Sequence, residues 1–109
     1  MSPKVSIIIP CYNHGHYLPE VLSNLNPESP DYEVIIINDG STQDDTIKAL
    51  ETFRAKKFRI IDQENKGLSA ARNTGILNAR GSFILMLDAD NTIENSYIEQ
   101  AIKSFEMDP

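Results

Sequence analysis

The sequence predicts an α/β protein in which helices cover a layered parallel sheet. Short apolar runs that suit buried strands alternate with stretches of helical spacing, and this strand-helix unit recurs along the whole chain. Strands separated by single helices pair in parallel through right-handed crossovers, so the alternation itself indicates the fold class. Polar residues follow each expected strand, and such sheets bind ligands at the carboxyl ends of their strands.

Composition limits the class of protein. With 109 residues the chain suits one domain, and we expect a single domain over residues 1–109. The formal net charge of −6 argues against a nucleic-acid partner, which needs a basic face. The apolar runs are too short for a membrane span or a signal peptide, so we expect a cytoplasmic protein. Its single cysteine, Cys11, excludes an internal disulfide and fits a reducing compartment.

The first expected strand covers residues 5–9, and we expect Pro10 to close it because proline donates no ladder hydrogen bond. Pro19 is tolerable only in the first turn of the helix that follows. The apolar residues of that helix keep helical spacing on one face, namely Leu18, Val21, Leu22 and Leu25.

The second expected strand, residues 33–37, leads into a helix. Ser41 and Asp44 resemble a capping box at its start. We expect its inner side to carry Ile47, Leu50 and Phe53. A third strand, residues 58–61, alternates with the charged Arg59 and suits an edge of the sheet.

The third helix is expected over residues 68–79. Its apolar stripe consists of Leu68, Ala71, Gly75, Ile76 and Ala79. Arg72 falls inside this stripe near the helix start, so its charged end should reach the rim of the sheet. The small residues at 71, 75 and 79 should let the helix lie close to the strands.

The fourth strand, residues 83–87, is apolar throughout and suits burial on both faces. Asp88 and Asp90 follow it, and two carboxylates so close together need a cationic partner such as a divalent ion that also holds phosphate oxygens. Alternatively, Asp88 to Asn91 cap the next helix. The inner residues expected for that helix are Tyr97, Ile98, Ala101, Ile102 and Phe105.

Four segments together resemble the nucleotide-binding half of a family 2 inverting glycosyltransferase with the GT-A type of fold. They are "VSIIIPCYN", "EVIIINDGSTQDDT", "ENKGLSAARNTGILNARG" and "FILMLDADN", in that order and with matching spacing. The resemblance extends from about Val5 to Asn91. It implies a Rossmann-like parallel sheet with strand order 3-2-1-4 and helices on both faces.

The resemblance implies transfer of a sugar from a nucleoside-diphosphate sugar, with UDP favoured, to an acceptor hydroxyl with inversion. It implies a divalent metal, Mn²⁺ or Mg²⁺, an acceptor sugar or lipid-linked glycan, and a place in polysaccharide biosynthesis at the inner face of a membrane. The family's general base lies far downstream, and we expect it beyond residue 109. The chain then resembles a fragment that binds the donor and is inactive alone.

The nucleotide-sugar site implied by the resemblance consists of Pro10, Tyr12, Asn13, Asp39, Gly40, Arg72, Asp88 and Ala89. Tyr12 would stack on the base, and Asp39 would accept the imino hydrogen of uracil. Arg72 would donate to a base carbonyl or lie near the phosphates. Asp88 would hold ribose hydroxyls, and Asp90 would bind the metal. For three of these residues a purely structural role stays open: loop packing for Tyr12, a turn for Asp39 and an ion pair for Arg72.

Two other functions and one assembly property remain open. In a haloacid-dehalogenase-type phosphohydrolase Asp88 would be the nucleophile and Asp90 a general acid/base, which accounts for only one of the four segments. A non-catalytic nucleotide-binding module is the second alternative.

Cys11, His14 and His16 lack a fourth ligand and make a poor zinc site. We also expect self-association through residues 82–88, because the strand at residues 83–87 is an apolar sheet edge without charge or proline.

Overall fold

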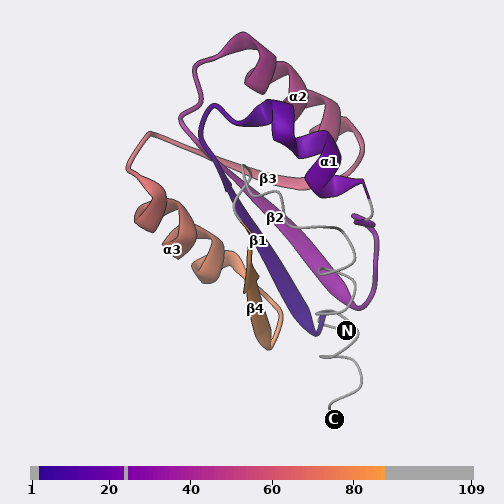
Figure 1. Cartoon of the computed structure of the whole chain (residues 1–109). Helices are drawn as coiled ribbons and strands as arrows, with labels where there is room; N and C mark the ends of the chain where they lie inside the picture. The colour runs from indigo at the N-terminus through magenta and orange to yellow at the C-terminus, as the bar shows by residue number, and fades with distance from the viewer. Residues whose placement is uncertain (1–2, 24, 88–109) are drawn as a thin grey trace.

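The computed structural model describes residues 3–23 and 25–87 (Figure 1). The order of its elements is β1 (Val5–Cys11), the short 3₁₀ helix η1 (Gly15–Tyr17), α1 (Leu18–Leu22), β2 (Tyr32–Asp39), α2 (Asp44–Ala55), β3 (Arg59–Gln63), α3 (Leu68–Asn78) and β4 (Phe83–Met86). The helix expected around Tyr97 lies outside the described residues, as do Asp88, Ala89, Asp90 and Asn91.

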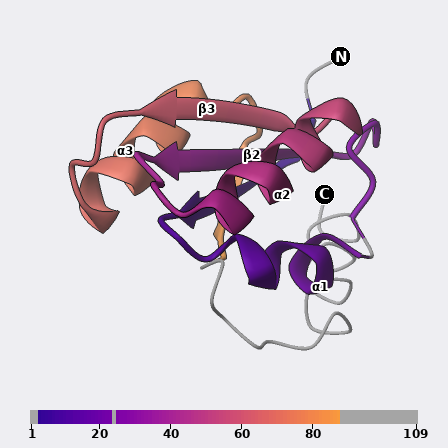
Figure 2. The same cartoon turned by 90° about the horizontal axis from the view of Figure 1, so that it is seen from above.

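The four strands form one parallel sheet in the order β3-β2-β1-β4. Helices α1 and α2 cover one face of this sheet, and α3 covers the other (Figures 1 and 2). The α/β class, the strand order 3-2-1-4 and the helices on both faces are therefore confirmed, and so is the edge position of the third strand. No helix in the described ranges has both the length and the apolar character to cross a membrane.

The core has two parts because successive strand residues point to opposite faces. Under α1 and α2, the larger cluster includes Val5, Ile7 and Ile9 of β1, while Ile8 joins the smaller cluster beneath α3. A Cβ on Gly75 would collide with the side chain of Ile8. The small residue therefore lets α3 lie directly on β1, as the sequence predicted.

Strand β1 does not end at Pro10 but continues to Cys11, with Pro10 paired to Ile37. The carbonyl of Ile8 accepts a hydrogen bond from Leu87 N–H, so Ile8 faces β4. Every second residue of a strand faces the same neighbour, and Pro10 therefore faces that side too. There β4 ends at Met86, opposite Ile8, so the missing N–H of the proline interrupts no ladder bond of the described strands.

The expected capping box is wrong. Helix α2 starts at Asp44 with Gln43 as its N-cap, and no side chain caps it. Instead, Ser41 Oγ accepts a hydrogen bond from the backbone N–H of Asn13 at 3.1 Å. Ser41 therefore ties the end of β1 to the loop after β2.

Several apolar side chains expected inside are exposed. Ile47 is 42% exposed on α2, where the smaller Thr46 takes the buried position. Leu68 and Ile76 of α3 are also exposed, so only the small residues of that stripe meet the sheet. Phe83 and Ile84 are exposed as well, because β4 is an edge of the described sheet and is not buried on both faces.

Candidate functional site

The carboxyl ends of β1, β2 and β3 lie side by side at one edge of the sheet, which we call the rim. Parallel register pairs Cys11 with Asn38 and Asp39 with Gln63. Residues 24 and 27 positions apart in sequence thus become neighbours at the rim. This is the edge at which the sequence predicted a ligand site.

Asp39 is the most enclosed polar residue of the rim, with 3% of its surface exposed. Its Oδ1 accepts hydrogen bonds from Gln63 Nε2 at 2.9 Å and from the backbone N–H of Lys66 at 2.9 Å. Its Oδ2 accepts a hydrogen bond from the backbone N–H of Gly67 at 3.0 Å. Asp39 therefore organises the loop between β3 and α3 around its carboxylate.

Burial alone would raise the pKa of Asp39 because it disfavours the charged form. The hydrogen bonds from Gln63, Lys66 and Gly67 outweigh that effect and hold the pKa below its ordinary value of 3.8. Asp39 is consequently a carboxylate at neutral pH. A fixed carboxylate in a sheltered place is a strong acceptor for an N–H group of a ligand.

Gly40 allows the loop after β3 to press against the end of β2. Its φ of +71° is strained for a residue with a side chain, and an added Cβ would lie 2.6 Å from the backbone N of Asn65. The Nδ2 of Asn65 donates to the backbone carbonyl of Asp39 at 3.2 Å. The position needs glycine for this packing alone, whatever contact Gly40 makes with a ligand.

Asn13 has a positive φ of 56° and holds the loop after β2. Its Oδ1 accepts hydrogen bonds from the backbone N–H groups of Thr42 at 2.8 Å and Gln43 at 3.0 Å. Its Nδ2 donates to Thr42 Oγ1 at 3.2 Å. Asn13 was predicted to bind the nucleotide sugar, but these contacts engage both acceptor positions of its side chain.

The other predicted residues differ in accessibility. Tyr12 follows β1 with 44% of its surface exposed, so its ring is open to a stacking partner. Pro10 is buried within β1, whereas Arg72 is half-buried on α3. Burial raises the pKa of the Cys11 thiol, which argues against a nucleophilic role.

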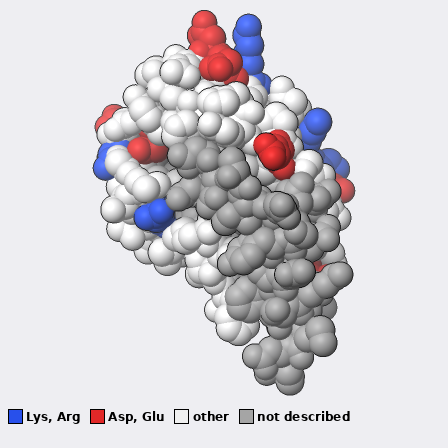
Figure 3. All heavy atoms as spheres, viewed as in Figure 1, with Lys and Arg blue, Asp and Glu red and all other residues white. Residues whose placement is uncertain are grey.

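The predicted metal residue Asp90 and its neighbours Asp88 and Ala89 lie outside the described residues. Within residues 3–23 and 25–87, no three His, Cys, Asp or Glu side chains are grouped as metal ligands. The charges on the face in Figure 3 are scattered and of both signs over the described residues.

Sequence reasoning missed the contribution of Gln63 and Thr74. Gln63 ends β3 and donates to Asp39, while its Oε1 accepts a hydrogen bond from Thr74 Oγ1 of α3 at 2.6 Å. The only signal in the sequence was a polar residue where the third strand meets the rim, within "DQENKG". Helical spacing could not show that Thr74 faces the end of β3.

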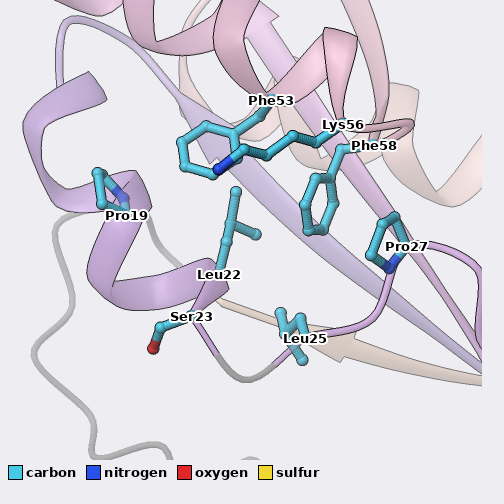
Figure 4. Close-up of a pocket in the computed structure, with 8 residues that line it drawn as sticks. All are labelled: Pro19, Leu22, Ser23, Leu25, Pro27, Phe53, Lys56 and Phe58. Carbon is cyan, nitrogen blue, oxygen red and sulfur yellow. The ribbon is translucent and has the colours of Figure 1, made fainter.

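An apolar groove of about 360 Å³ lies between α1 and the last turn of α2, away from the rim (Figure 4). Its lining residues are Pro19, Leu22, Ser23, Leu25, Pro27, Phe53, Lys56 and Phe58. The rings of Phe53 and Phe58 meet edge to face at 5.7 Å, and Lys56 Nζ lies 5.5 Å from the centre of the Phe53 ring. The described residues that line it include one hydroxyl, that of Ser23, and no acidic side chain.

Known proteins resemble both the sequence and the fold. The chain is 39% identical over 106 residues to glycosyltransferase GlyA of Streptococcus pneumoniae serotype 4, covering 94% of this chain and 15% of GlyA. It is 41% identical over 109 residues to the chondroitin synthase of Escherichia coli, covering 97% of this chain and 16% of the synthase. The chain spans 15 to 31% of the length of the first four curated relatives that it matches.

Two solved structures with bound nucleotides share the fold. S. aureus TarS 1–349 in complex with UDP has a TM-score of 0.69 and 28% identity, covering 94% of this chain and 32% of TarS 1–349. The mannosyltransferase PcManGT from Pyrobaculum calidifontis, in complex with GDP-Man and Mn²⁺, has a TM-score of 0.70 and 25% identity. That match covers all of this chain and 34% of PcManGT.

The sequence model described as "Glycosyl transferase family 2" matches residues 6–109, nearly the whole chain. It includes the segments that form the rim and the two aspartates after β4. The order of the strands and the position of Asp39 at the end of β2 agree with the resemblance seen in the sequence. The chain belongs to glycosyl transferase family 2.

Proposed function

We propose that this chain supplies the donor-binding part of a glycosyltransferase that moves a sugar from a UDP-sugar to an acceptor hydroxyl with inversion. The observation that carries the proposal is Asp39, an ionised carboxylate held by three internal donors at the rim. TarS 1–349 and PcManGT share the fold and bind nucleotides, which supports a nucleotide as the ligand of this chain. Because the chain spans a small share of its relatives, we assign it donor binding and place the general base beyond the matched segment.

Within this proposal Asp39 accepts the imino N–H of uracil, and the exposed ring of Tyr12 stacks on the base. Pro10, Asn13 and Gly40 shape the rim beneath the nucleotide, since their own contacts are internal. Arg72, one turn from the start of α3, would donate to a base carbonyl or a phosphate.

The proposal assigns ribose binding to Asp88 with Ala89, and metal binding to Asp90. Leu87 is hydrogen bonded to β1, so the described chain leads directly from the sheet toward this segment. Carboxylate oxygens suit a hard cation such as Mn²⁺ or Mg²⁺. A bound ion would offset the charge of the departing nucleoside diphosphate.

Two alternatives have less support. A phosphohydrolase of the haloacid-dehalogenase type would use Asp88 and Asp90 but would give Asp39 and its loop no role. A non-catalytic nucleotide-binding module would share the site, and the two differ only in transfer activity. The finer biological setting that we propose is polysaccharide synthesis at the cytoplasmic face of a membrane, with an acceptor sugar or lipid-linked glycan.

The test is calorimetric titration of UDP into the chain in the presence of Mn²⁺, and again after chelation. We expect binding that weakens at least tenfold without metal, in line with a metal that carries diphosphate charge. Asp90→Asn should abolish the metal effect. Asp62→Asn is the matched control, because Asp62 is an exposed rim carboxylate already paired with Arg54. Equal UDP binding with and without metal would contradict the proposal.

We also propose that two copies of the chain associate through β4. Phe83 and Leu87 donate their N–H groups to Lys4 and Ile8 of β1, so the backbone groups of Ile84 and Met86 point away from β1. A two-fold axis at Leu85 would pair each Ile84 with Met86 of the second copy, which makes this short edge self-complementary.

Light scattering tests the association. The unmutated chain should show a dimer mass at high concentration, and Ile84→Lys should shift it toward the monomer. Ile84 is 38% exposed, whereas Leu85 packs against the larger core cluster, so changing Ile84 preserves the fold better. Thr52→Lys, at an exposed position of α2, is the control. A monomer mass for the unmutated chain would refute the pairing.

A further inference from the structure

Asp39 is connected to helix α3 through one intervening side chain. The hydroxyl of Thr74 lies 2.6 Å from Gln63 Oε1, and Gln63 Nε2 lies 2.9 Å from Asp39 Oδ1. These three residues come from α3, β3 and β2, and they meet only in the folded protein. Neither Gln63 nor Thr74 belongs to the set of ligand residues implied by the family resemblance.

The two contacts fix which end of the Gln63 amide faces Asp39. If the amide were reversed, its oxygen would face an ionised carboxylate and two acceptors would be opposed. With the oxygen toward the Thr74 hydroxyl, both contacts pair a donor with an acceptor. The Thr74 hydroxyl lies nearer to Gln63 Oε1, at 2.6 Å, than to the Ala70 carbonyl, at 3.0 Å. The amide N–H of Gln63 is therefore held against Oδ1 of Asp39.

This arrangement leaves the carboxylate with little remaining capacity. A carboxylate has about four acceptor positions, two on each oxygen. Gln63 and the Lys66 N–H occupy both positions of Oδ1, and the Gly67 N–H occupies one position of Oδ2. Among the described residues no second donor to Oδ2 is found, so one acceptor position on Oδ2 remains for a ligand.

We propose that Gln63, oriented by Thr74, is a positioning residue that selects the base by limiting Asp39 to a single acceptor. Uracil offers one imide N–H and matches a single acceptor. Guanine offers a ring N–H beside an amino group, a pair that matches both oxygens of a carboxylate. This inference rests on the proposed nucleotide site and adds the preference for uracil over guanine.

The experiment measures the affinities of UDP and GDP for each variant in the presence of Mn²⁺. The reported quantity is the affinity for UDP divided by the affinity for GDP. Gln63→Leu removes the amide at similar size and releases the carboxylate. We expect UDP to weaken about threefold, because Asp39 keeps its acceptor for the imide N–H but is held less firmly. GDP should weaken less or bind better, so the ratio falls. A change that merely loosened the loop would weaken both nucleotides alike.

Variants of Thr74 test the other end of the connection. Thr74→Val keeps the shape and removes the hydroxyl, so the ratio should fall in the same direction by a smaller factor. Thr74→Ser keeps the hydroxyl and is the matched control, with a ratio close to that of the unmutated chain. Circular dichroism and thermal melting of each variant show whether it is folded.

Gln63→Glu provides a readout in pH. At neutral pH two carboxylates would face each other, and UDP should bind poorly. On acidification they share a proton, and the protonated group donates to its neighbour as the amide did. UDP affinity relative to the unmutated chain at the same pH should therefore rise between about pH 7 and about pH 5.

Two results overturn the inference: a UDP to GDP ratio in Gln63→Leu equal to that of the unmutated chain, or a Gln63→Glu variant without the acidic recovery. An unmutated chain that binds neither nucleotide in the presence of metal contradicts the proposed function itself. The two failures are therefore distinguishable.

Discussion

Asn13 and Asp39 occupy similar places but differ in what their side chains have left to offer. Each lies at the end of a strand, and each holds the backbone of a neighbouring loop by accepting N–H groups. Asn13 has both acceptor positions of its oxygen filled by Thr42 and Gln43. Asp39 carries a charge and, after three internal bonds, retains one acceptor.

The difference shows that a polar residue at the rim is not by itself a ligand residue. A neutral amide whose acceptors are filled can stabilise a loop but adds little to recognition. A buried carboxylate with one open position can do both. Changes at Asn13 should therefore act on stability, and changes at Asp39 should act on stability and on ligand choice.

The largest effect should come from Gly40→Ala, which disturbs the backbone directly after Asp39. The new Cβ meets the Asn65 backbone at a φ of +71°, so we expect a loss of about 3 kcal/mol or more in the free energy of unfolding. Gly67→Ala is the matched control, because Gly67 also has a positive φ but an open space around its Cβ. Urea denaturation of both variants gives the difference, and equal losses would mean that the contact with Asn65 is unimportant.

Asp39→Asn should weaken UDP by about 1–3 kcal/mol, because the amide puts N–H groups where donors already point. ADP, which lacks an imide N–H, should be affected less. Competition titration with the two nucleotides measures this. A variant that binds UDP as well as the unmutated chain would remove Asp39 from base recognition.

Asn13→Gly should lower the free energy of unfolding by about 1–2 kcal/mol, since it removes the side-chain bonds to Thr42 and Gln43. Glycine keeps the positive φ without strain. UDP affinity should stay close to that of the unmutated chain under conditions where the variant is fully folded. A loss of UDP affinity as large as that of Asp39→Asn would show that Asn13 recognises the ligand as Asp39 does.

The smallest effect is the pH dependence of stability. The pKa of Asp39 in the folded chain is lower than its ordinary value of 3.8, so its stabilising contribution is fully present above that value. The contribution is lost as the pH falls through the folded-state pKa. Urea midpoints followed into this acid range should decrease, and the decrease should be shallower in Asp39→Asn. Identical slopes would show that the hydrogen bonds to Asp39 do not favour its charged form.

The sequence alone predicted the architecture because strand runs and helical spacing repeat along the whole chain. It predicted Asp39 and Gly40 as site residues through the family resemblance, and both lie at the rim. It could not predict the exposure of Ile47 and Ile76, because an apolar residue at helical spacing does not reveal how much of the helix the sheet covers.

The contacts of Gln63 and Ser41 could not be predicted from the sequence for a related reason. Gln63 meets Asp39 from 24 positions away, and Ser41 meets Asn13 from 28 positions away. Such pairs depend on register between strands that no local pattern encodes. Local chemistry suggested a helix cap for Ser41, but its Oγ accepts a hydrogen bond from the distant Asn13 N–H instead.

The edge position of β3 gives the nucleotide proposal a kinetic signature. Edge strands open more easily than central ones, and each opening of β3 would carry Gln63 away from Asp39. A ligand that binds only the closed arrangement would make those openings rarer. Occupancy at the rim should thus be readable as slower hydrogen–deuterium exchange of the backbone amide of Ile61, which faces β2.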